Sequence, residues 1–385
     1  MTIPLPLSGI SIIDLTTQIP GPFCTMHLAD LGAHVIKVES LSGDPLRAFP
    51  SMFASVNRGK RSITLNLKND RGKEILQRLL KTADVLMEGF RPGVVQRLGA
   101  DYDMAKGIKP DIVYCSISGF GQTGPYRGRA GHDVNYISIG GLMGQAEIAN
   151  DRPSTPPVLI SDMASGMYAA MAVLAALRHR DSSGLGQYID LSMTDAVVSW
   201  MAPEIARAHD MEEAPDRPLL SGLPHYDVFK TSDDLYLSIG IVYESHFWGN
   251  MCDALDIQEW QDLTTHERSI RSAEIKERLT SIFKTETRSY WDKLLQSHDV
   301  PCGPVYDVKE IQNDPQFKHR GTFSDLDATD GSSSRQVAPP FRFENLATGS
   351  DVPPPSLGGD TDDLLFKAGY SREQIVDLRR HGAIT

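Results

Sequence analysis

The sequence predicts an α/β protein in which a large domain with a largely parallel sheet is joined to a smaller α+β domain. Two observations favour this class. Strand-like and helical patterns alternate through the first 120 residues, as expected when parallel strands are connected by helices. The chain of 385 residues also exceeds the length at which one hydrophobic core usually keeps growing, which indicates two domains.

The spacing of apolar residues predicts the elements of the first half in order. An apolar run favours a strand at 10–15, and a proline-bearing turn at 18–24 leads into a helix through residue 31. Further strands are expected at 34–39, 62–67, 84–90 and 111–118, with an amphipathic helix at 70–83. A long apolar helix begins at residue 162, ends before the stop signal at 182–186, and is followed by a strand or helix entry at 188–193.

The second half predicts a linker, a small domain and a return to the large domain. An acidic, proline-bearing segment at 210–220 is typical of a linker. The small domain is expected to contain a hairpin at 226–242 that turns at 232–234, and helices at 273–284 and 287–297. A mobile loop at 327–336, a proline-rich surface segment at 337–358 and a helix pair at 361–380 complete the chain. The expected boundaries are 1–205 for the first part of the large domain, 206–222 for the linker, 223–325 for the small domain and 326–385 for the return.

The overall composition, 41% hydrophobic and 23% charged, is ordinary for a soluble globular protein. The formal net charge of −12 argues against nucleic acid or an anionic membrane as the main partner. The N-terminus lacks the pattern of a signal peptide, and the longest apolar run, 163–177, is short for a membrane span. Four widely spaced cysteines suggest a reducing compartment and form no metal-ligand pattern. We therefore expect a cytoplasmic protein with no membrane span.

A glycine-rich segment, GFGQTG at 119–124, formally matches the dinucleotide fingerprint and follows a predicted strand. The fingerprint also requires a helix that begins among its glycines, whereas Pro125-Tyr126-Arg127-Gly128 continues as a loop. We therefore do not expect a nicotinamide site. Glycines that allow the backbone to approach a ligand closely are the preferred interpretation.

His132 and Asp162 are the candidate catalytic residues. Gly131 before the histidine and the 133–135 turn after it favour an imidazole presented on a loop, and Asp162 opens an apolar helix. Both also have structural interpretations, because a lone histidine is often structural and Ser161-Asp162 suits a helix N-cap. Proton transfer near neutral pH nevertheless needs two such groups, each able to give or take a proton.

Glu244 follows an apolar strand and is a further candidate. It has two interpretations that the residues alone leave open: a solvated acid at a strand end, or a carboxylate that bonds the imidazole of His132 and supports its charged form.

Basic residues recur near the ends of the early predicted strands and could together bind the phosphates of a nucleotide-like ligand. They are Lys37, Arg47, Arg58, Lys60, Arg61 and Arg91. The sequence has no P-loop, HExxH, CxxC or GxSxG motif, so ATP hydrolysis through a P-loop, zinc hydrolysis and serine hydrolysis are poorly supported.

Several longer segments resemble a known family, the class III CoA transferases and the α-methylacyl-CoA racemases that share their fold. The similar segments are LADLGAHVIKVE (28–39), NRGKRSITLNLK (57–68), ADVLMEGFRPGVVQRLG (83–99), SISGFGQTGPY (116–126), SSGLGQYIDLSM (182–193) and VPCGPVYDV (300–308). They extend through nearly the whole chain.

The resemblance implies a large Rossmann-like domain that binds most of the CoA, a smaller domain, and a homodimer whose two chains interlock. In the transferases the carboxylate that matches Asp162 is the nucleophile. In the racemases it faces a histidine, matched by His132, across the substrate α-carbon. Glu244 aligns with the glutamate that bonds this histidine, and Arg91 of EGFRPG with a CoA contact.

The leading hypothesis is a racemase or epimerase that acts on 2-methyl-branched acyl-CoA thioesters, with CoA as part of the substrate and no cofactor or metal. The alternative is a CoA transferase that forms an aspartyl intermediate on Asp162. It is kept because SISGFGQ has the form common in transferases, and because MASGM after Asp162 lacks the dense glycines of racemases. A CoA-binding protein without catalysis is the third interpretation. Chain length and branching of the acyl group, the identity of any CoA acceptor and the pathway are not predicted.

Overall fold

The structure, a computed structural model, describes residues 3–145, 148–149, 152–210, 220, 222–327, 331 and 333–385. The chain forms two compact units, 1–202 with 318–385, and 203–317. The second unit begins and ends earlier than the predicted small domain of 223–325. Most of the predicted linker segment at 210–220 lies outside the described residues.

A six-stranded parallel sheet forms the centre of the first unit, in the order β3-β2-β1-β4-β5-β8. Its strands are β1 (Ser11–Asp14), β2 (His34–Glu39), β3 (Lys60–Thr64), β4 (Val85–Glu88), β5 (Val113–Ser118) and β8 (Tyr188–Ser192). The α/β prediction with a Rossmann-like large domain is therefore confirmed. The third strand begins two residues earlier than expected, at Lys60 instead of residue 62.

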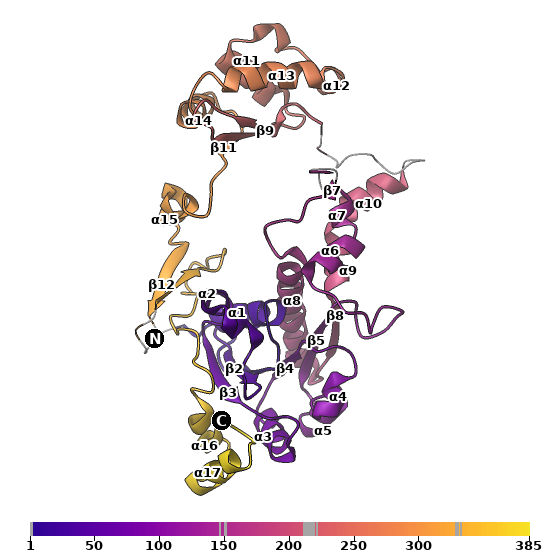
Figure 1. The fold of residues 1–385 in the computed structure, drawn as a ribbon, viewed down its shortest axis with the longest axis vertical. Coiled ribbons are helices and arrows are strands. Elements are labelled where there is room, and N and C mark those ends of the chain that lie inside the picture. The colour runs from indigo at the N-terminus through magenta and orange to yellow at the C-terminus, as the bar shows by residue number, and fades with distance from the viewer. Residues whose placement is uncertain are drawn as a thin grey trace. The chain divides into compact units, whose positions relative to one another are not determined.

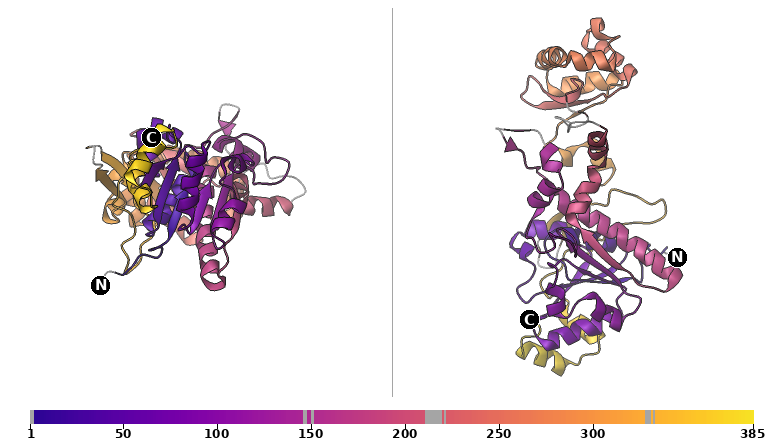
Figure 2. Two further views of the ribbon diagram at one scale, coloured as in Figure 1. Left: turned by 90° about the horizontal axis from the view of Figure 1, so that it is seen from below. Right: turned by 90° about the vertical axis from the view of Figure 1, so that its right-hand side faces the viewer.

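Helices cover both faces of this sheet (Figure 2). The helices of the first unit up to residue 202 are α1 (Pro20–Asp30), η1 (Pro45–Ala48), α2 (Pro50–Ser55), α3 (Asp70–Leu80), α4 (Val94–Leu98), α5 (Tyr102–Ile108), α6 (Asp133–Ile139), α7 (Leu142–Gln145), α8 (Ile160–Ser183) and α9 (Met193–Trp200). The short strands β6 (Ile148–Ala149) and β7 (Arg152–Pro153) pair with each other, and α10 (Ala202–His209) follows α9.

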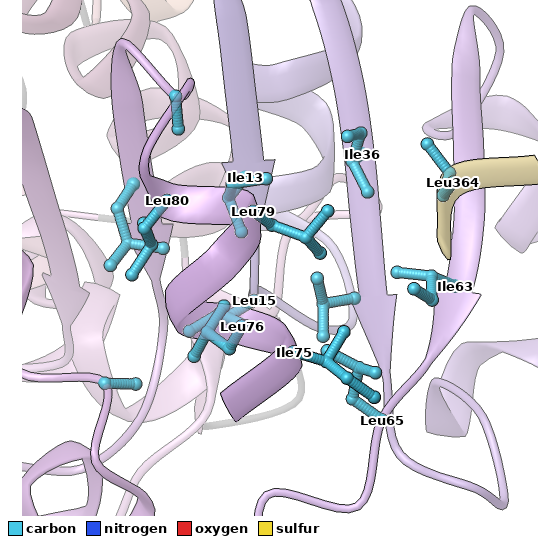
Figure 3. Packing of buried hydrophobic residues seen from close by; sticks show 14 of the residues in the cluster. Ile13, Leu15, Ile36, Ile63, Leu65, Ile75, Leu76, Leu79, Leu80 and Leu364 are labelled. Carbon is cyan, nitrogen blue, oxygen red and sulfur yellow. The ribbon is translucent and has the colours of Figure 1, made fainter. Parts of the chain in front are cut away.

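Successive residues of a strand point to opposite sides of the sheet. Because the successive residues are apolar here, both faces of the sheet are hydrophobic. Ile13 packs in the cluster with Ile75 of α3 (Figure 3), whereas its neighbour Ile12 packs in the cluster with Leu28 of α1. Leu364 near the C-terminus joins the Ile13 cluster. The C-terminal segment therefore completes the core of the first unit.

The order of the strands reverses between β1 and β4, because β2 and β3 lie on one side of β1 and β5 and β8 on the other side of β4. Loops that leave neighbouring parallel strands in opposite directions open a crevice at their carboxyl ends, where ligands of such sheets usually bind. The fold therefore places a candidate site at the ends of β1 and β4.

Helix α8 is the one helix in the described part of the chain whose length and mean hydropathy would suit a membrane span. Its Ala169 and Val173 are buried in the cluster that also contains Leu28 of α1. Half of its most apolar stretch is buried. These contacts are those of a core helix.

The prediction of a mobile loop at 327–336 was partly wrong. Strands β12 (Phe323–Asp327) and β13 (Ser333–Val337) form an antiparallel pair. The side chain of Gln336 is 2% exposed and donates to the carbonyl of Ala54 in α2 at 3.2 Å. Because β12 pairs with β13, residues 323–327 belong to the first unit, which resumes at residue 318 and not at 326. The predicted helix pair at the C-terminus is confirmed as α16 (Thr361–Lys367) and α17 (Arg372–Arg380).

The second unit is an α+β unit with a core of its own (Figure 1). Its three-stranded sheet has the order β11-β10-β9, with both pairs antiparallel, which confirms the predicted hairpin. Its strands and helices are β9 (Tyr226–Lys230), β10 (Tyr236–Gly240), α11 (Ser245–Leu255), η2 (Gln258–Trp260), α12 (Thr265–Ile270), α13 (Ser272–Phe283), α14 (Arg288–Ser297), β11 (Cys302–Pro304) and η3 (Ile311–Asn313), and α15 (Pro315–His319) spans the boundary between the units.

Candidate active site

A cavity of about 250 Å³ lies at the expected crevice of the first unit. The segment after β1 (16–21), the segment after β4 (89–92) and the end of β5 with its loop (117–120) form part of its wall. The remaining lining residues are Arg127, Arg129, Gly131, His132, Tyr136, Asp162 and Met193. His132 and Asp162, the two predicted catalytic residues, thus line the same cavity.

Asp162 lies in the first turn of α8, two residues after the helix begins at Ile160. The expectation that Ser161-Asp162 forms the N-cap was wrong, because the N-cap residue is Leu159 and it makes no side-chain cap hydrogen bond. Within the described residues, no hydrogen bond to the carboxylate of Asp162 is formed. Its half-buried carboxyl group is therefore free to face the cavity.

Asp133 supplies the cap that α8 lacks in its own sequence. Its Oδ1 accepts hydrogen bonds from the backbone N–H and the hydroxyl of Ser161, both at 2.7 Å, and from the N–H of Asp162 at 3.3 Å. A carboxylate at a helix N-terminus is favoured by the unpaired N–H groups and the helix dipole. Buried Asp133 thereby fixes the start of α8, the helix that contains Asp162.

The pKa of Asp162 is raised from the usual range of a carboxyl group to about 7. Burial is the main cause, because it disfavours the ionised form, and the neighbouring charge of Asp133 adds to the rise. An acid with such a pKa holds and releases a proton with similar ease near neutral pH. The environment of Asp162 is therefore that of an acid–base group.

His132 is the residue immediately before α6 and has extended backbone geometry. Its side chain is exposed, and its backbone N–H donates to Oδ1 of Asn135 at 3.0 Å. This hydrogen bond closes the first turn of α6 and fixes the histidine at the rim of the cavity. The expectation of an imidazole presented on a loop is thus met.

Tyr136 explains two of the glycines in the cavity wall. Its hydroxyl donates to the carbonyl of Gly131 at 2.6 Å, and a Cβ atom at Gly119 or Gly131 would lie 2.4 Å or 2.7 Å from its ring. The pKa of Tyr136 is raised by burial and by the charge of Asp162. These two glycines therefore make room for a tyrosine beside the acid, where the sequence suggested room for a ligand.

The GFGQTG segment continues β5 as a loop, and the next helix begins only at Asp133. The expectation that residues 125–128 continue as a loop is confirmed, so the segment lacks the helix that a dinucleotide fingerprint requires after its glycines.

The segment after β1, which forms part of the cavity wall, contains a turn at Gln18. The φ of Gln18, 63°, lies in the left-handed region. Only a few per cent of residues other than glycine adopt this conformation. The backbone N–H of Gln18 donates to Oδ1 of Asp44 at 3.1 Å, and the Nζ of Lys37 donates to the carbonyl of Thr16 at 3.0 Å. Buried charged groups thus hold this turn in place.

Lys37, Lys60 and Arg58, three of the predicted phosphate contacts, are at most 3% exposed. Each already forms an ion pair with an aspartate. The pairs are Lys37 with Asp44 at 2.8 Å, Lys60 with Asp14 at 3.3 Å and Arg58 with Asp30 at 2.6 Å. Their cationic groups do not reach solvent, so we assign them to the support of the fold and not to ligand binding.

Arg47 and Arg61 are partly exposed but are also paired. Arg47 forms a bidentate contact with Glu39, with both distances 2.7 Å, and Arg61 contacts Asp360 at 2.9 Å and Asp363 at 2.5 Å. Neither lines the cavity. Their role as phosphate contacts stays a prediction.

Arg91 is the predicted cation that lines the cavity, together with Arg127 and Arg129, which the sequence did not single out. In the part of the chain that the structure describes, none of these three guanidinium groups forms an ion pair. Arg129 lies 5.3 Å from the centre of the Tyr126 ring. Unpaired cations in a protein of net charge −12 favour an anionic ligand in this cavity.

Glu244 lies in the second unit, directly before α11. Its Oε2 accepts hydrogen bonds from the N–H groups of Val242 at 3.0 Å and Tyr243 at 3.1 Å. Backbone hydrogen bonds of this kind lower its pKa. Because His132 lies in the other unit, the contact between the two residues stays a prediction.

A parallel sheet whose switch-point cavity holds an imidazole and a carboxyl group of near-neutral pKa defines an enzyme of acid–base or nucleophilic chemistry. The model of CoA-transferase family III matches residues 7–361, and the chain belongs to this family. It is therefore an enzyme of the class III CoA-transferase and racemase superfamily, whose members act on acyl-CoA thioesters.

Relatives with both activities are similar to this chain over nearly its whole length. Succinyl-CoA:glutarate CoA-transferase of Homo sapiens is 34% identical, with 98% of this chain and 90% of the relative covered. Alpha-methylacyl-CoA racemase of Homo sapiens is 31% identical, with 97% and 96% covered. The crystal structure of a CAIB/BAIF family protein from Brucella suis has a TM-score of 0.86 and 31% identity, with 95% of this chain and 100% of that chain covered.

No group of three or more histidine, cysteine, aspartate or glutamate side chains that could hold a metal ion occurs among the described residues.

Proposed function

We propose that this protein is a cofactor-free racemase or epimerase that inverts the α-carbon of 2-methyl-branched acyl-CoA thioesters. The observation that carries the proposal is that His132 and Asp162 line one cavity and that the pKa of Asp162 is about 7. A reversible reaction needs each group to act as a base in one direction and as an acid in the other. A near-neutral pKa makes both states of Asp162 available at the same pH.

The proposed reaction is a 1,1-proton transfer. In one direction neutral His132 removes the α-proton, the C–H electrons move into the thioester to form an enolate, and protonated Asp162 delivers its proton to the opposite face of the same carbon. The products are the inverted thioester, imidazolium and carboxylate, and the reverse direction restores the starting states. We expect backbone N–H groups of the glycine-rich cavity segments to stabilise the enolate oxygen.

Unpaired Arg91, Arg127 and Arg129 support the binding of an anionic CoA ester at this cavity. The proposal also includes the predicted interlocked homodimer and a cytoplasmic location. The apolar side chains of Met167 and Met171 on α8, at 45% and 59% exposure, support a surface on the first unit for the second copy of the chain.

A CoA transferase is the second candidate function. It is favoured by the succinyl-CoA:glutarate transferase among the similar proteins and by the carboxyl group of Asp162, which accepts no hydrogen bond from a described residue. Ionised Asp162 would attack the thioester carbonyl and release CoA thiolate, leaving an acyl–aspartyl anhydride. The thiolate would then attack the aspartyl carbonyl and release the first acid. The acceptor carboxylate would displace CoA to form a second anhydride, and attack of CoA on its acyl carbonyl would free Asp162.

Deuterium incorporation separates the two functions. Purified protein is incubated in D₂O with a (2R)-2-methylacyl-CoA, with and without a free carboxylic acid acceptor. Deuterium at the α-carbon with inversion, independent of acceptor, is expected for the racemase. Acceptor-dependent exchange of CoA, with hydroxylamine trapping an acyl group on Asp162, would instead establish the transferase and overturn the leading proposal.

Replacing Asp133 with asparagine should lower the pKa of Asp162, because it removes a neighbouring negative charge while an amide oxygen still caps α8. The limb of the pH–kcat profile that reports Asp162 should move from near pH 7 to lower pH. Asp133→Ala is the matched control, since it should give the same shift and also reduce stability by about 1 kcal/mol through loss of the cap. A profile that stays in place in both variants would mean that Asp133 does not influence the proton on Asp162.

A further inference from the structure

A chain of hydrogen-bonded polar residues connects two loops of the cavity wall. It begins at Glu88, the last residue of β4, whose side chain is 1% exposed. Oε2 of Glu88 accepts the backbone N–H of Phe90 at 2.8 Å, and Oε1 accepts the hydroxyl of Ser116 on β5. Because Phe90 and Arg91 line the cavity, the carboxyl group directly holds the backbone of the loop after β4.

The chain continues into the loop after β5. The Nε2 of Gln122 donates to the hydroxyl oxygen of Ser116 at 2.6 Å, and the backbone N–H of Gln122 donates to the two carboxylate oxygens of Asp190 at 3.0 and 3.1 Å. Gly119 and Phe120, which precede Gln122, also line the cavity. The hydroxyl of Ser116 therefore links Glu88, which holds the loop after β4, to Gln122 in the loop after β5.

Burial of the Glu88 carboxyl group costs free energy of folding. Within the described residues no lysine or arginine pairs with it, and its pKa is raised to about 7, first by burial and also by the charge of Asp190. The hydrogen bonds from Ser116 and Phe90 act in the opposite direction. A neutral amide at this position could form hydrogen bonds with both partners without the cost of burying an ionisable group. A purely structural requirement for a carboxyl group at this strand end is therefore weak.

We propose that Glu88 and Ser116 are positioning residues that hold the loops after β4 and β5 in the positions needed to bind the CoA ester. Neither residue is among those that line the cavity, so both would act through Phe90, Arg91 and Phe120, which do line it. The inference requires that the cavity binds a CoA ester, as the proposed function does, but it does not depend on which reaction follows.

Two substitutions at Glu88 separate positioning from general support of the fold. In Glu88→Gln the carbonyl oxygen still accepts from Phe90 and the amide group still reaches Ser116, so binding should stay within about threefold of wild type. In Glu88→Leu both bonds are lost. The KM for acyl-CoA and the Kd of a CoA ester measured by calorimetry should then rise about tenfold to a hundredfold, the scale expected from the loss of hydrogen bonds to a charged group. Because Glu88→Leu leaves the N–H of Phe90 and the hydroxyl of Ser116 without this acceptor, its thermal unfolding temperature should fall, and the affinity is therefore measured at a temperature at which the variant is fully folded.

Tyr114→Phe is the matched control. Tyr114 also lies on β5, and its buried hydroxyl donates to the carbonyl of Ala100 at 2.9 Å, but it does not line the cavity. Its loss should change stability without changing KM or Kd. Ser116→Ala should raise KM in the same way as Glu88→Leu.

Three outcomes would overturn the inference. They are wild-type affinity in Glu88→Leu, equal loss of affinity in Glu88→Gln and Glu88→Leu, and a loss in Glu88→Leu that is matched by Tyr114→Phe. Failure of wild-type protein to bind any CoA ester would instead refute the proposed function, so the two failures are distinguishable.

Discussion

Replacing Asp162 with asparagine should reduce the rate of α-carbon inversion by about 10²–10⁴-fold, the contribution typical of one general acid–base group. Asparagine keeps the shape of the side chain but neither accepts nor releases a proton near neutral pH. The same substitution removes the nucleophile of the transferase reaction, so it should also abolish any CoA transfer. Steady-state inversion and acceptor-dependent transfer are the two rates to measure.

The stability of Asp162→Asn provides the control. The folded-state pKa of Asp162, about 7, is higher than the ordinary value of 3.8. The folded protein therefore favours the protonated form, and the stability associated with this group is fully present below pH 3.8 and is lost as pH rises from 3.8 to about 7. At pH 8 the neutral variant should unfold at the same or a higher temperature than wild type. An inactive variant that is also markedly less stable at pH 8 would contradict the described environment of this carboxyl group.

The alternation of strands and helices was sufficient to predict the α/β class, because each element follows from the local spacing of apolar residues. The segment 34–39 is β2 with the same bounds. The strand at 62–67 was placed two residues late because its alternation of apolar and polar residues begins only at Ser62, whereas β3 begins at Lys60. In the fold Lys60 is buried against Asp14 and Arg61 is paired with Asp360.

Residues of the candidate site could be predicted where a short sequence segment identifies them. They were missed where their role depends on contacts with residues far along the chain. His132 and Asp162 were found because each follows a recognisable local signal. Asp133 was not, although it directly follows the histidine, because its function as a cap becomes visible only when residue 161 is brought beside it. The basic residues show the same limit: burial and ion pairs with residues far along the chain decide which cations can meet a ligand.

Replacing His132 with glutamine should reduce the α-proton exchange that we propose for His132 by about 10²–10⁴-fold, because glutamine has no basic nitrogen. The binding of a CoA ester should change little, since Arg91, Arg127 and Arg129 remain in the cavity wall. The measurement is wash-in of deuterium from D₂O into each enantiomer of the thioester. His179→Gln is the matched control, because this exposed histidine lies on α8 and does not line the cavity.

The effect of His132→Gln should depend on which enantiomer is supplied. A two-base site predicts that the enantiomer whose α-proton faces His132 loses exchange, whereas the other, deprotonated by Asp162, still exchanges its proton with solvent but no longer inverts. Asp162→Asn should show the opposite preference, because the intact base would then be the imidazole. If both enantiomers lost exchange equally in both variants, the two groups would not act on opposite faces of one carbon. If His132→Gln retained full acceptor-dependent CoA transfer and wild type showed no exchange, the chemistry of this cavity would be that of the aspartyl nucleophile alone.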